Sequence, residues 1–180
     1  SAQRMFEIID AVPEVKESPN PLRPDALRGE IELKNVTFGY ESHKPILKDI
    51  SFHVDAGEVF GIVGRSGAGK STLVNLISRL YDTQEGEVLV DGVNVKQYGF
   101  HELRKNVAMV SQETYIFMGT VAENIAYARP DATREEIIRA AVQANAHDFI
   151  CKMPEGYDTL LGSSSRSLSG GEKQRISIAR

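Results

Sequence analysis

The sequence predicts an α/β fold, and two alternating apolar segments are the first features that support it. Residues 31–33 and 50–54 alternate apolar and polar side chains, as half-buried strands do. Residues 59–63, Val-Phe-Gly-Ile-Val, form a short continuous apolar run that is typical of a strand buried in a parallel sheet. Apolar residues at helical spacing follow in residues 73–80 and predict a helix that packs on the sheet. That stripe consists of Leu73, Leu76, Ile77 and Leu80.

Later segments extend the predicted sheet and add a largely helical second part. Residues 87–91 indicate another strand, and residues 107–110 indicate a second buried strand. The sequence Thr133-Arg-Glu-Glu136 has the pattern of a capping box, which predicts a helix from there to about Cys151. A last helix is expected to begin at Ser169.

The first residues predict a short helix followed by a linker. Residues 2–11 place apolar side chains on one helical face, and Pro13 ends that pattern. Four of the seven prolines then lie between Pro13 and Pro24, which indicates an extended linker. We therefore divide the chain into a linker segment, 1–29, and a globular domain, 30–180. The apolar residues of the predicted first helix are Met5, Ile8 and Ile9, with Phe6 beside them.

Length and composition limit the classes of protein to which the chain can belong. With 180 residues, 41% of them apolar, it is long enough for one substantial core and too short for two. A formal net charge of −4 gives no basic surplus for binding nucleic acid. The single cysteine, Cys151, cannot form an internal disulfide, and the four histidines lack metal-ligand spacing. Because no apolar run approaches the roughly 18 residues of a membrane span, we expect a soluble piece.

Residues 64–72 contain the pattern G-x-x-x-x-G-K-[ST] of a phosphate-binding loop. The pattern lies between a predicted buried strand and an amphipathic helix, which is the context that such a loop needs. Its glycines permit positive φ and let backbone N–H groups converge on phosphate oxygens at the positive end of the helix dipole. Lys70 would reach the β- and γ-phosphates, and the Ser71 hydroxyl would coordinate Mg²⁺. The candidate nucleotide-binding residues of the loop are Gly64, Arg65, Ser66, Gly67, Ala68, Gly69, Lys70, Ser71 and Thr72.

A second glycine motif, Leu-Ser-Gly-Gly-Glu at residues 168–172, begins the last predicted helix. Its serine has the chemistry of an N-cap and its glycines expose backbone amides, so this helix start is a second candidate anion site. Alone the tripeptide S-G-G is a weak signal. With Lys-Gln-Arg at residues 173–175, and with the phosphate loop, it resembles the signature of the ATP-binding cassette, the motor of ABC transporters. The signature residues are Leu168, Ser169, Gly170, Gly171 and Glu172.

The resemblance implies a fold and a partner. In ABC proteins the signature contacts the γ-phosphate of ATP held by the partner subunit, so two cassettes, identical or different, close head to tail over two nucleotides. The implied fold is an α/β P-loop NTPase core with an antiparallel β portion and a helical subdomain. On this basis residues 30–99 correspond to the nucleotide-binding core, and residues 100–180 to the Q-loop and the helical subdomain with the signature.

Two further positions resemble functional residues of ABC cassettes. Phe-Gly-Tyr at residues 38–40 looks like the A-loop, in which an aromatic ring, here Tyr40, stacks on adenine. Val-Ser-Gln at residues 110–112 looks like the Q-loop, in which a glutamine, here Gln112, approaches Mg²⁺ and the attacking water and senses the membrane domain. The alternatives are an ordinary aromatic residue at the end of a strand for Tyr40 and a solvated loop residue for Gln112.

Three stretches resemble exporters in particular: residues 116–125, residues 153–159 and residues 4–10, the last of which follows the final transmembrane helix in exporters. The resemblance implies an ATPase that couples ATP binding and hydrolysis to transport of a solute, drug or lipid. Its transmembrane domain would belong to the same parent chain, with the cassette on the cytoplasmic face of the cell membrane. The alternatives are a soluble ABC ATPase without a membrane partner and a nucleotide-binding fragment that does not hydrolyse ATP.

The chain also departs from the exporter pattern. After Gly162, residues 163–166 contain no acidic residue, where exporters usually have one. The strand that ends in Asp-Glu, the D-loop and the switch histidine would lie beyond Arg180. We therefore expect a cassette truncated after the signature, with an incomplete sheet in which the strand at 59–63 has an unpaired edge and an uncovered face. We also expect these 180 residues alone not to hydrolyse ATP in steady state.

Overall fold

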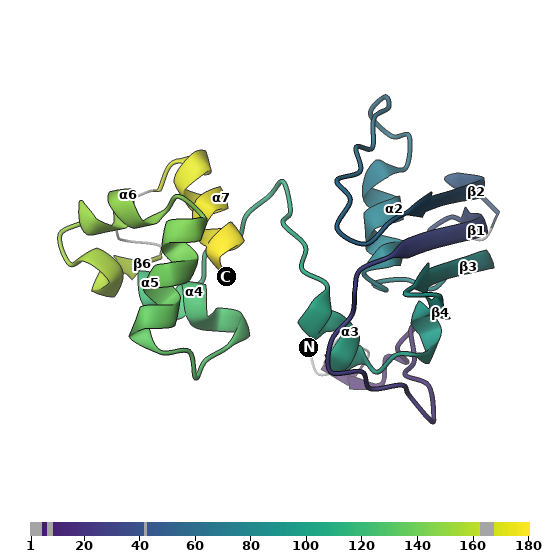
Figure 1. Ribbon diagram of the computed structural model, residues 1–180, viewed down its shortest axis with the longest axis horizontal. Coiled ribbons are helices and arrows are strands. Elements are labelled where there is room, and N and C mark those ends of the chain that lie inside the picture. The colour runs from purple at the N-terminus through teal and green to yellow at the C-terminus, as the bar shows by residue number, and fades with distance from the viewer. Residues whose placement is uncertain (1–4, 7–8, 42, 163–167) are drawn as a thin grey trace. The chain divides into compact units, whose positions relative to one another are not determined.

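The computed structural model describes residues 5–6, 9–41, 43–162 and 168–180, in two compact units (Figure 1). The first unit comprises Ser1–Ala108 and the second Met109–Arg180. Each unit has its own hydrophobic core, so the prediction that the chain is too short for two cores was wrong. The finer division at residues 99 and 100, between a nucleotide-binding core and a helical subdomain, stays a prediction.

The first unit contains a four-stranded antiparallel sheet with the strand order β2-β1-β3-β4 (Figure 1). Ile31 lies opposite Val54 of β2 and Val90 of β3, so β1 occupies the middle of the sheet between strands from different parts of the chain. The three strands predicted from alternation and from the apolar run at 87–91 are thereby confirmed. The strands are β1 (Ile31–Phe38), β2 (Leu47–Val54), β3 (Glu85–Val90) and β4 (Val93–Asn94).

Helix α2 (Lys70–Ile77) packs its apolar stripe into the core of the sheet, as predicted. Leu73 and Leu76 are both buried there. Leu80, the last residue of the predicted stripe, is exposed, because the helix ends at Ile77 and Arg79 turns the chain with a φ of 50°. The unit also contains two shorter helices, η1 (Val95–Gln97) and α3 (Phe100–Asn106).

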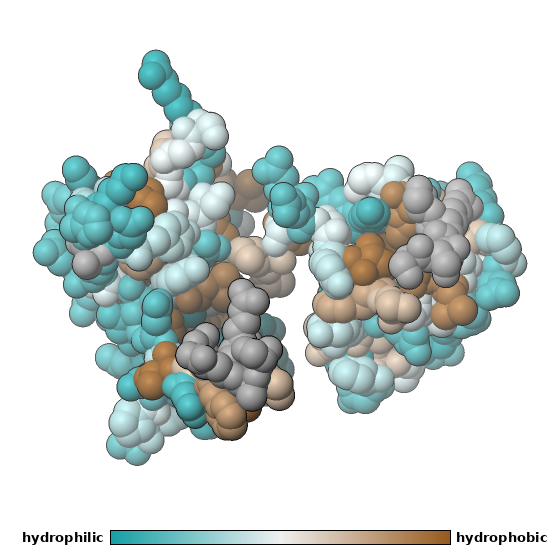
Figure 2. All heavy atoms as spheres, turned by 180° about the vertical axis from the view of Figure 1, so that it is seen from behind, coloured by the Kyte–Doolittle hydropathy of each residue, from teal (hydrophilic) through white to brown (hydrophobic). Residues whose placement is uncertain are grey.

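Two apolar runs that we predicted as buried strands, 59–63 and 107–110, form no strand. Val59 is 97% exposed and Val63 is 93% exposed, so apolar side chains reach the surface of the first unit (Figure 2). A strand forms only where its backbone hydrogen-bonds to a neighbouring strand. No described segment pairs in this way with either run. The assignment of both runs as buried strands was therefore wrong, and the strand edge expected at 59–63 is not formed.

The second unit is mainly helical, as predicted, and its core forms around Val121, Ile150 and Ile176. A short antiparallel pair, β5 and β6, joins two segments that are about 40 residues apart, since Gly119 lies opposite Leu161. The elements in chain order are β5 (Gly119–Thr120), α4 (Val121–Ile125), η2 (Ala126–Ala128), α5 (Arg134–Gln143), α6 (His147–Cys151), η3 (Gly156–Asp158), β6 (Leu160–Leu161) and α7 (Gly170–Ala179).

The single helix predicted from Thr133 to about Cys151 is in fact two helices. α5 begins with the predicted capping box, in which Thr133 Oγ1 accepts a hydrogen bond from Glu136 N and Glu136 Oε2 accepts one from Thr133 N. Asn145 then has a φ of 53°, a left-handed conformation that ends the helical path. α6 begins two residues later and ends at Cys151, which is exposed.

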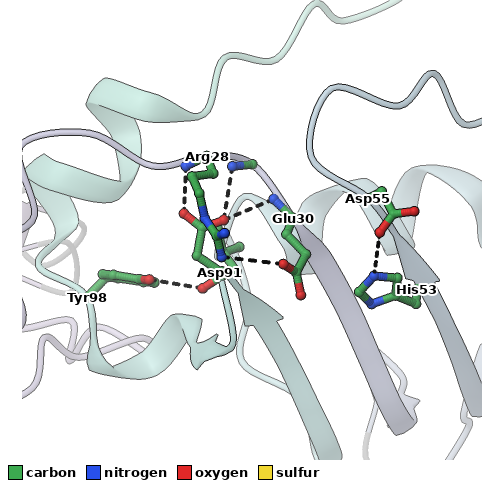
Figure 3. Close-up of polar contacts among 8 residues, drawn as sticks. Arg28, Glu30, His53, Asp55, Asp91 and Tyr98 are labelled. Carbon is green, nitrogen blue, oxygen red and sulfur yellow. Dashed lines mark hydrogen bonds and ion pairs between the residues drawn. The ribbon is translucent and has the colours of Figure 1, made fainter.

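The proline-rich linker lies extended along the first unit. Leu22 N donates to Gln97 O at 2.7 Å, and the buried guanidinium of Arg79 donates from Nη2 to Lys16 O at 2.8 Å. At the end of the linker the carboxylate of Asp91 accepts three backbone N–H groups (Figure 3). Their donors are Arg28 (2.6 Å), Gly29 (3.1 Å) and Glu30 (3.0 Å).

Part of the predicted first helix is described. Met5, Phe6 and Ile9 are helical and exposed, whereas Ile8, the third member of the predicted apolar face, lies outside the described residues. The acid-free segment 163–166 also lies outside them. Across the part of the chain that the structure describes, no helix combines the length and the apolar character that crossing a membrane requires.

Candidate functional site

The glycine loop between residues 63 and 70 leads into α2 and contains backbone conformations that only glycine adopts readily. Gly69 is the N-cap of α2 with a φ of 89°, and Gly67 has a φ of 80°. A Cβ added to Gly69 would also lie 2.7 Å from Leu47 Cδ2 and 3.1 Å from Ile46 Cγ2. Both the left-handed φ and the close approach of β2 therefore require glycine at the residue before Lys70.

The start of α2 presents backbone donors without acceptors. Gly69 has no side chain to cap the helix, and the first turn contains no acidic residue. Within the described chain, no acceptor lies in hydrogen-bond contact with the N–H groups of Gly67, Lys70 or Ser71. These donors meet the positive end of the helix dipole, and this combination favours an anion such as a phosphate.

Lys70 adds a full positive charge beside these donors. Its Nζ donates to the carbonyl oxygens of Gly64 and Arg65, each at 2.8 Å, so the loop curves around the ammonium group. An ammonium group has three protons, and these two bonds leave one for a ligand. The geometry therefore brings together the backbone amides and the lysine that the sequence predicted, and Ser71, at the same helix start, is exposed.

Tyr40 lies beside the same helix, as the A-loop prediction requires. Its hydroxyl is 3.3 Å from Thr72 Oγ1 and accepts a hydrogen bond from Asn75 Nδ2 at 3.3 Å. Its ring makes edge contacts with two other aromatic rings, Phe38 at 5.3 Å and Tyr81 at 5.0 Å between centroids. The Tyr40 side chain is nonetheless 51% exposed, so it can still contact a ligand.

Several residues around Tyr40 were not found from the sequence. Asn75 and Tyr81 belong to α2 and to the turn after it, and neither fits the apolar stripe that revealed the helix. Gln84 hydrogen-bonds to the backbone of Gly39, a contact across 45 residues that no local pattern contains. A cavity of about 380 Å³ lies beside this group and is lined by Glu14, Phe38, Gly39, Tyr40, Tyr81, Asp82 and Gln84.

The signature motif begins α7 with a capping box of its own. Glu172 N donates to Ser169 Oγ at 3.3 Å, and Glu172 Oε2 accepts from Ser169 N at 2.8 Å and from Ser169 Oγ at 2.9 Å. The expected N-cap at Ser169 is therefore confirmed. Leu168 is buried in the core of the second unit, while a Cβ added to either Gly170 or Gly171 would meet open space.

Gln112 belongs to the second unit and the phosphate loop belongs to the first. The glutamine lies in an exposed, irregular segment that precedes β5. Its predicted role beside Mg²⁺ and water, like that of Ser71 as a metal ligand, stays a prediction.

Comparison with known proteins assigns a family to this arrangement. The family model described as ABC transporter matches residues 47–180, a span that includes the phosphate loop and the signature motif. Among solved structures, one described as a bacterial Atm1-family ABC exporter with ATP bound superimposes with a TM-score of 0.91 and 43% sequence identity. That match covers 99% of this chain and 31% of the exporter chain.

Curated relatives agree with the structural match. The putative multidrug export ATP-binding/permease protein YgaD of Bacillus subtilis is 51% identical over 181 residues, which cover 100% of this chain and 31% of YgaD. The ATP-dependent lipid A-core flippase of Syntrophus aciditrophicus is 46% identical over 179 residues, which cover 99% of this chain and 30% of the flippase. The chain thus spans about a third of the length of these relatives.

Proposed function

Because the chain belongs to the ABC transporter family, we propose that it is the ATP-binding part of an exporter. In this proposal the intact protein couples ATP binding and hydrolysis to the transport of a solute, drug or lipid across a membrane. The observation that carries the proposal is the start of α2, where open backbone donors and Lys70 form a cradle for phosphate. The names of the relatives, a multidrug export protein and a lipid A-core flippase, support an exporter rather than a soluble ATPase.

The residues of the cradle fit the triphosphate of ATP. The open amides of Gly67, Lys70 and Ser71 and the third proton of Lys70 would bind the phosphate oxygens, and the Ser71 hydroxyl would bind Mg²⁺. By its resemblance to the Q-loop, Gln112 would be the second ligand of Mg²⁺. Bound Mg²⁺ would neutralise phosphate charge during phosphoryl transfer. Tyr40 would hold the adenine by stacking, for which its half-exposed ring beside α2 is suited.

Hydrolysis also needs carboxylates that orient water and bind the metal. In the described part of the first unit, no carboxylate hydrogen-bonds to the loop of residues 64–72. We propose in addition that residues 1–180 alone bind ATP without turning it over.

The signature motif would act on the nucleotide of a partner cassette. Gly170 and Gly171 at the start of α7 are exposed and have open space beside them, so a phosphate delivered by a second nucleotide-binding domain could approach their amides. A second partner would be the transmembrane domain of the same parent chain, which Gln112 would sense. The cassette would then lie at the cytoplasmic face of the membrane.

The experiment that tests this proposal uses the intact protein with Gly171→Leu. A bulky side chain fits the open space around residue 171 within its own subunit, so ATP binding to the phosphate loop should be unchanged. The same side chain would occupy the place of the partner's phosphate and should abolish phosphate release. Gly171→Ala, a smaller change at the same position, should give an intermediate rate.

Two results would contradict the proposal. Loss of ATP binding in the Gly171→Leu variant would place the signature in the nucleotide site of its own subunit. Unchanged phosphate release would show that α7 takes no part in turnover.

A further inference from the structure

The side chain of Gln84 holds the loop that carries Tyr40 through two hydrogen bonds to the backbone of Gly39. Its Oε1 accepts a hydrogen bond from Gly39 N at 3.0 Å, and its Nε2 donates to Gly39 O at 3.0 Å. One side-chain amide thus satisfies both backbone groups of a single residue, as a paired residue in an antiparallel sheet would do. Gln84 N also donates to Thr37 O at 3.2 Å, which anchors the residue that makes this pair.

The other side of Gly39 is closed by the chain itself. A Cβ at residue 39 would collide with the carbonyl oxygen of Lys44 and would lie 2.9 Å from Pro45 Cα. Ile46 N donates to Phe38 O at 2.7 Å, so the returning strand is also fixed just before Gly39. The peptide of Gly39 is therefore held between Gln84 and the segment of Lys44 and Pro45.

This restraint matters because a glycine precedes the aromatic residue. Glycine has the widest backbone freedom, and without Gln84 the φ and ψ of Gly39 could redirect the ring of Tyr40. With Gln84 in place, the ring lies between the edges of Phe38 and Tyr81, and its hydroxyl reaches Thr72 on α2. The carboxamide also lines the cavity of about 380 Å³ at this point.

We propose that Gln84 is the positioning residue that orients Tyr40 for stacking on a nucleobase, and so sets the base-dependent part of nucleotide affinity. The proposal rests on the proposed function, because it takes Tyr40 as the stacking residue. Gln84 acts through Gly39 and Tyr40 and makes no hydrogen bond to a residue of the phosphate loop, 64–72. Its loss should therefore weaken ligands that carry a base and spare ligands that consist of phosphate alone.

The test compares two ligands on the intact protein by calorimetric titration. One is a non-hydrolysable ATP analogue, AMP-PNP, and the other is inorganic tripolyphosphate. Gln84→Leu removes both hydrogen bonds at nearly constant volume. It should weaken AMP-PNP about tenfold, while tripolyphosphate binding changes by less than about twofold. Gln97→Ala is the matched control, because Gln97 is an exposed glutamine of the same unit whose side chain makes no hydrogen bond within the described chain.

A second variant keeps the test valid if Gln84→Leu fails to fold. Gln84→Glu keeps the acceptor for Gly39 N but turns a carboxylate oxygen toward Gly39 O, so it loses one of the two hydrogen bonds and should also weaken AMP-PNP. In the background of Tyr40→Ala, either Gln84 variant should cause no further loss of AMP-PNP affinity, because there is no ring left to orient.

The outcomes separate this inference from the function on which it rests. If Tyr40→Ala weakens AMP-PNP and neither Gln84 variant does, the positioning role is wrong and the nucleotide site stands. If the Gln84 variants weaken tripolyphosphate as much as AMP-PNP, Gln84 supports the whole unit and does not orient the base. If Tyr40→Ala itself leaves AMP-PNP affinity unchanged, the adenine site proposed above is wrong.

Discussion

The two helix starts predicted as anion sites, those of α2 and α7, are built in opposite ways. α2 has a glycine at its N-cap, no side-chain cap and no acid in its first turn. α7 has a serine at its N-cap, a complete capping box and Glu172 in its first turn. The first helix leaves its amides open beside Lys70, whereas the second satisfies part of its own donors and places a carboxylate beside them.

This difference indicates a division of roles. A glycine N-cap is less stabilising than a serine cap by only a few tenths of a kcal/mol, and it leaves donors for a ligand to satisfy. A capped start is stable without a ligand, and its negative side chain opposes an anion that arrives without other cationic contacts. We therefore expect the start of α2 to bind phosphate within its own subunit, and α7 to engage phosphate only when a partner presents it.

The largest expected effect comes from Gly69→Ala at the N-cap of α2. The φ of 89° and the contact with Leu47 Cδ2 should destabilise the first unit by about 1–3 kcal/mol and weaken ATP binding. Gly171→Ala is the matched control in α7, where the new methyl meets open space and should be neutral or slightly stabilising. Hydrogen-exchange protection of each unit measures both effects. Equal losses of protection in Gly69→Ala and Gly171→Ala would contradict the difference between the two helix starts.

Ser169→Ala should have the next largest effect. Loss of the cap should destabilise the start of α7 by about 1 kcal/mol and leave α2 unchanged. Ser177→Ala, inside the same helix, should be neutral or stabilising because alanine has the higher helix propensity. Amide exchange at residues 170–173 measures the difference, and an unchanged rate in Ser169→Ala would mean that the capping box contributes no stability.

The smallest expected effect is a pH dependence of the capping box of α5, which has the same pattern of hydrogen bonds as the capping box of α7. In this box the backbone N–H of Thr133 donates a hydrogen bond to the Glu136 carboxylate. This bond, together with the nearby Arg129, lowers the pKa of Glu136 below its usual value. A lowered folded pKa means that this stabilisation is present above the usual glutamate pKa of about 4.3 and is lost as the pH falls through the folded value. Amide chemical shifts at the start of α5 should therefore change in acid, and Glu136→Gln should abolish that change. If these chemical shifts still change with pH in Glu136→Gln, the change belongs to another titrating group.

The features predicted well from the sequence are those with a local cause. The capping box predicted at Thr133 and the N-cap predicted at Ser169 depend on side chains within three residues of their partners, and both are present. The phosphate loop likewise depends on consecutive residues, and its lysine and amides lie together. Local chemistry was therefore enough to place both helix starts.

The features that were missed or wrong have non-local causes. The runs at 59–63 and 107–110 have the composition of buried strands, but a strand requires a partner from elsewhere in the chain. The break at Asn145 depends on a left-handed backbone inside an otherwise helical pattern. Gln84 is visible only after folding brings it to Gly39. Sequence patterns therefore located the helix starts better than the long-range contacts around them.

The central claim is that the start of α2 binds the phosphates of ATP within its own subunit, and Lys70→Ala tests it most directly. Calorimetric titration of the intact protein with Mg-ATP should show at least a tenfold loss of affinity, about 1.4 kcal/mol, because the variant loses the only ammonium group that hydrogen-bonds within the loop. Lys48→Ala, an exposed lysine of β2, should bind ATP as the unaltered protein does. Equal affinities of Lys70→Ala and Lys48→Ala, with both proteins folded, would contradict the account.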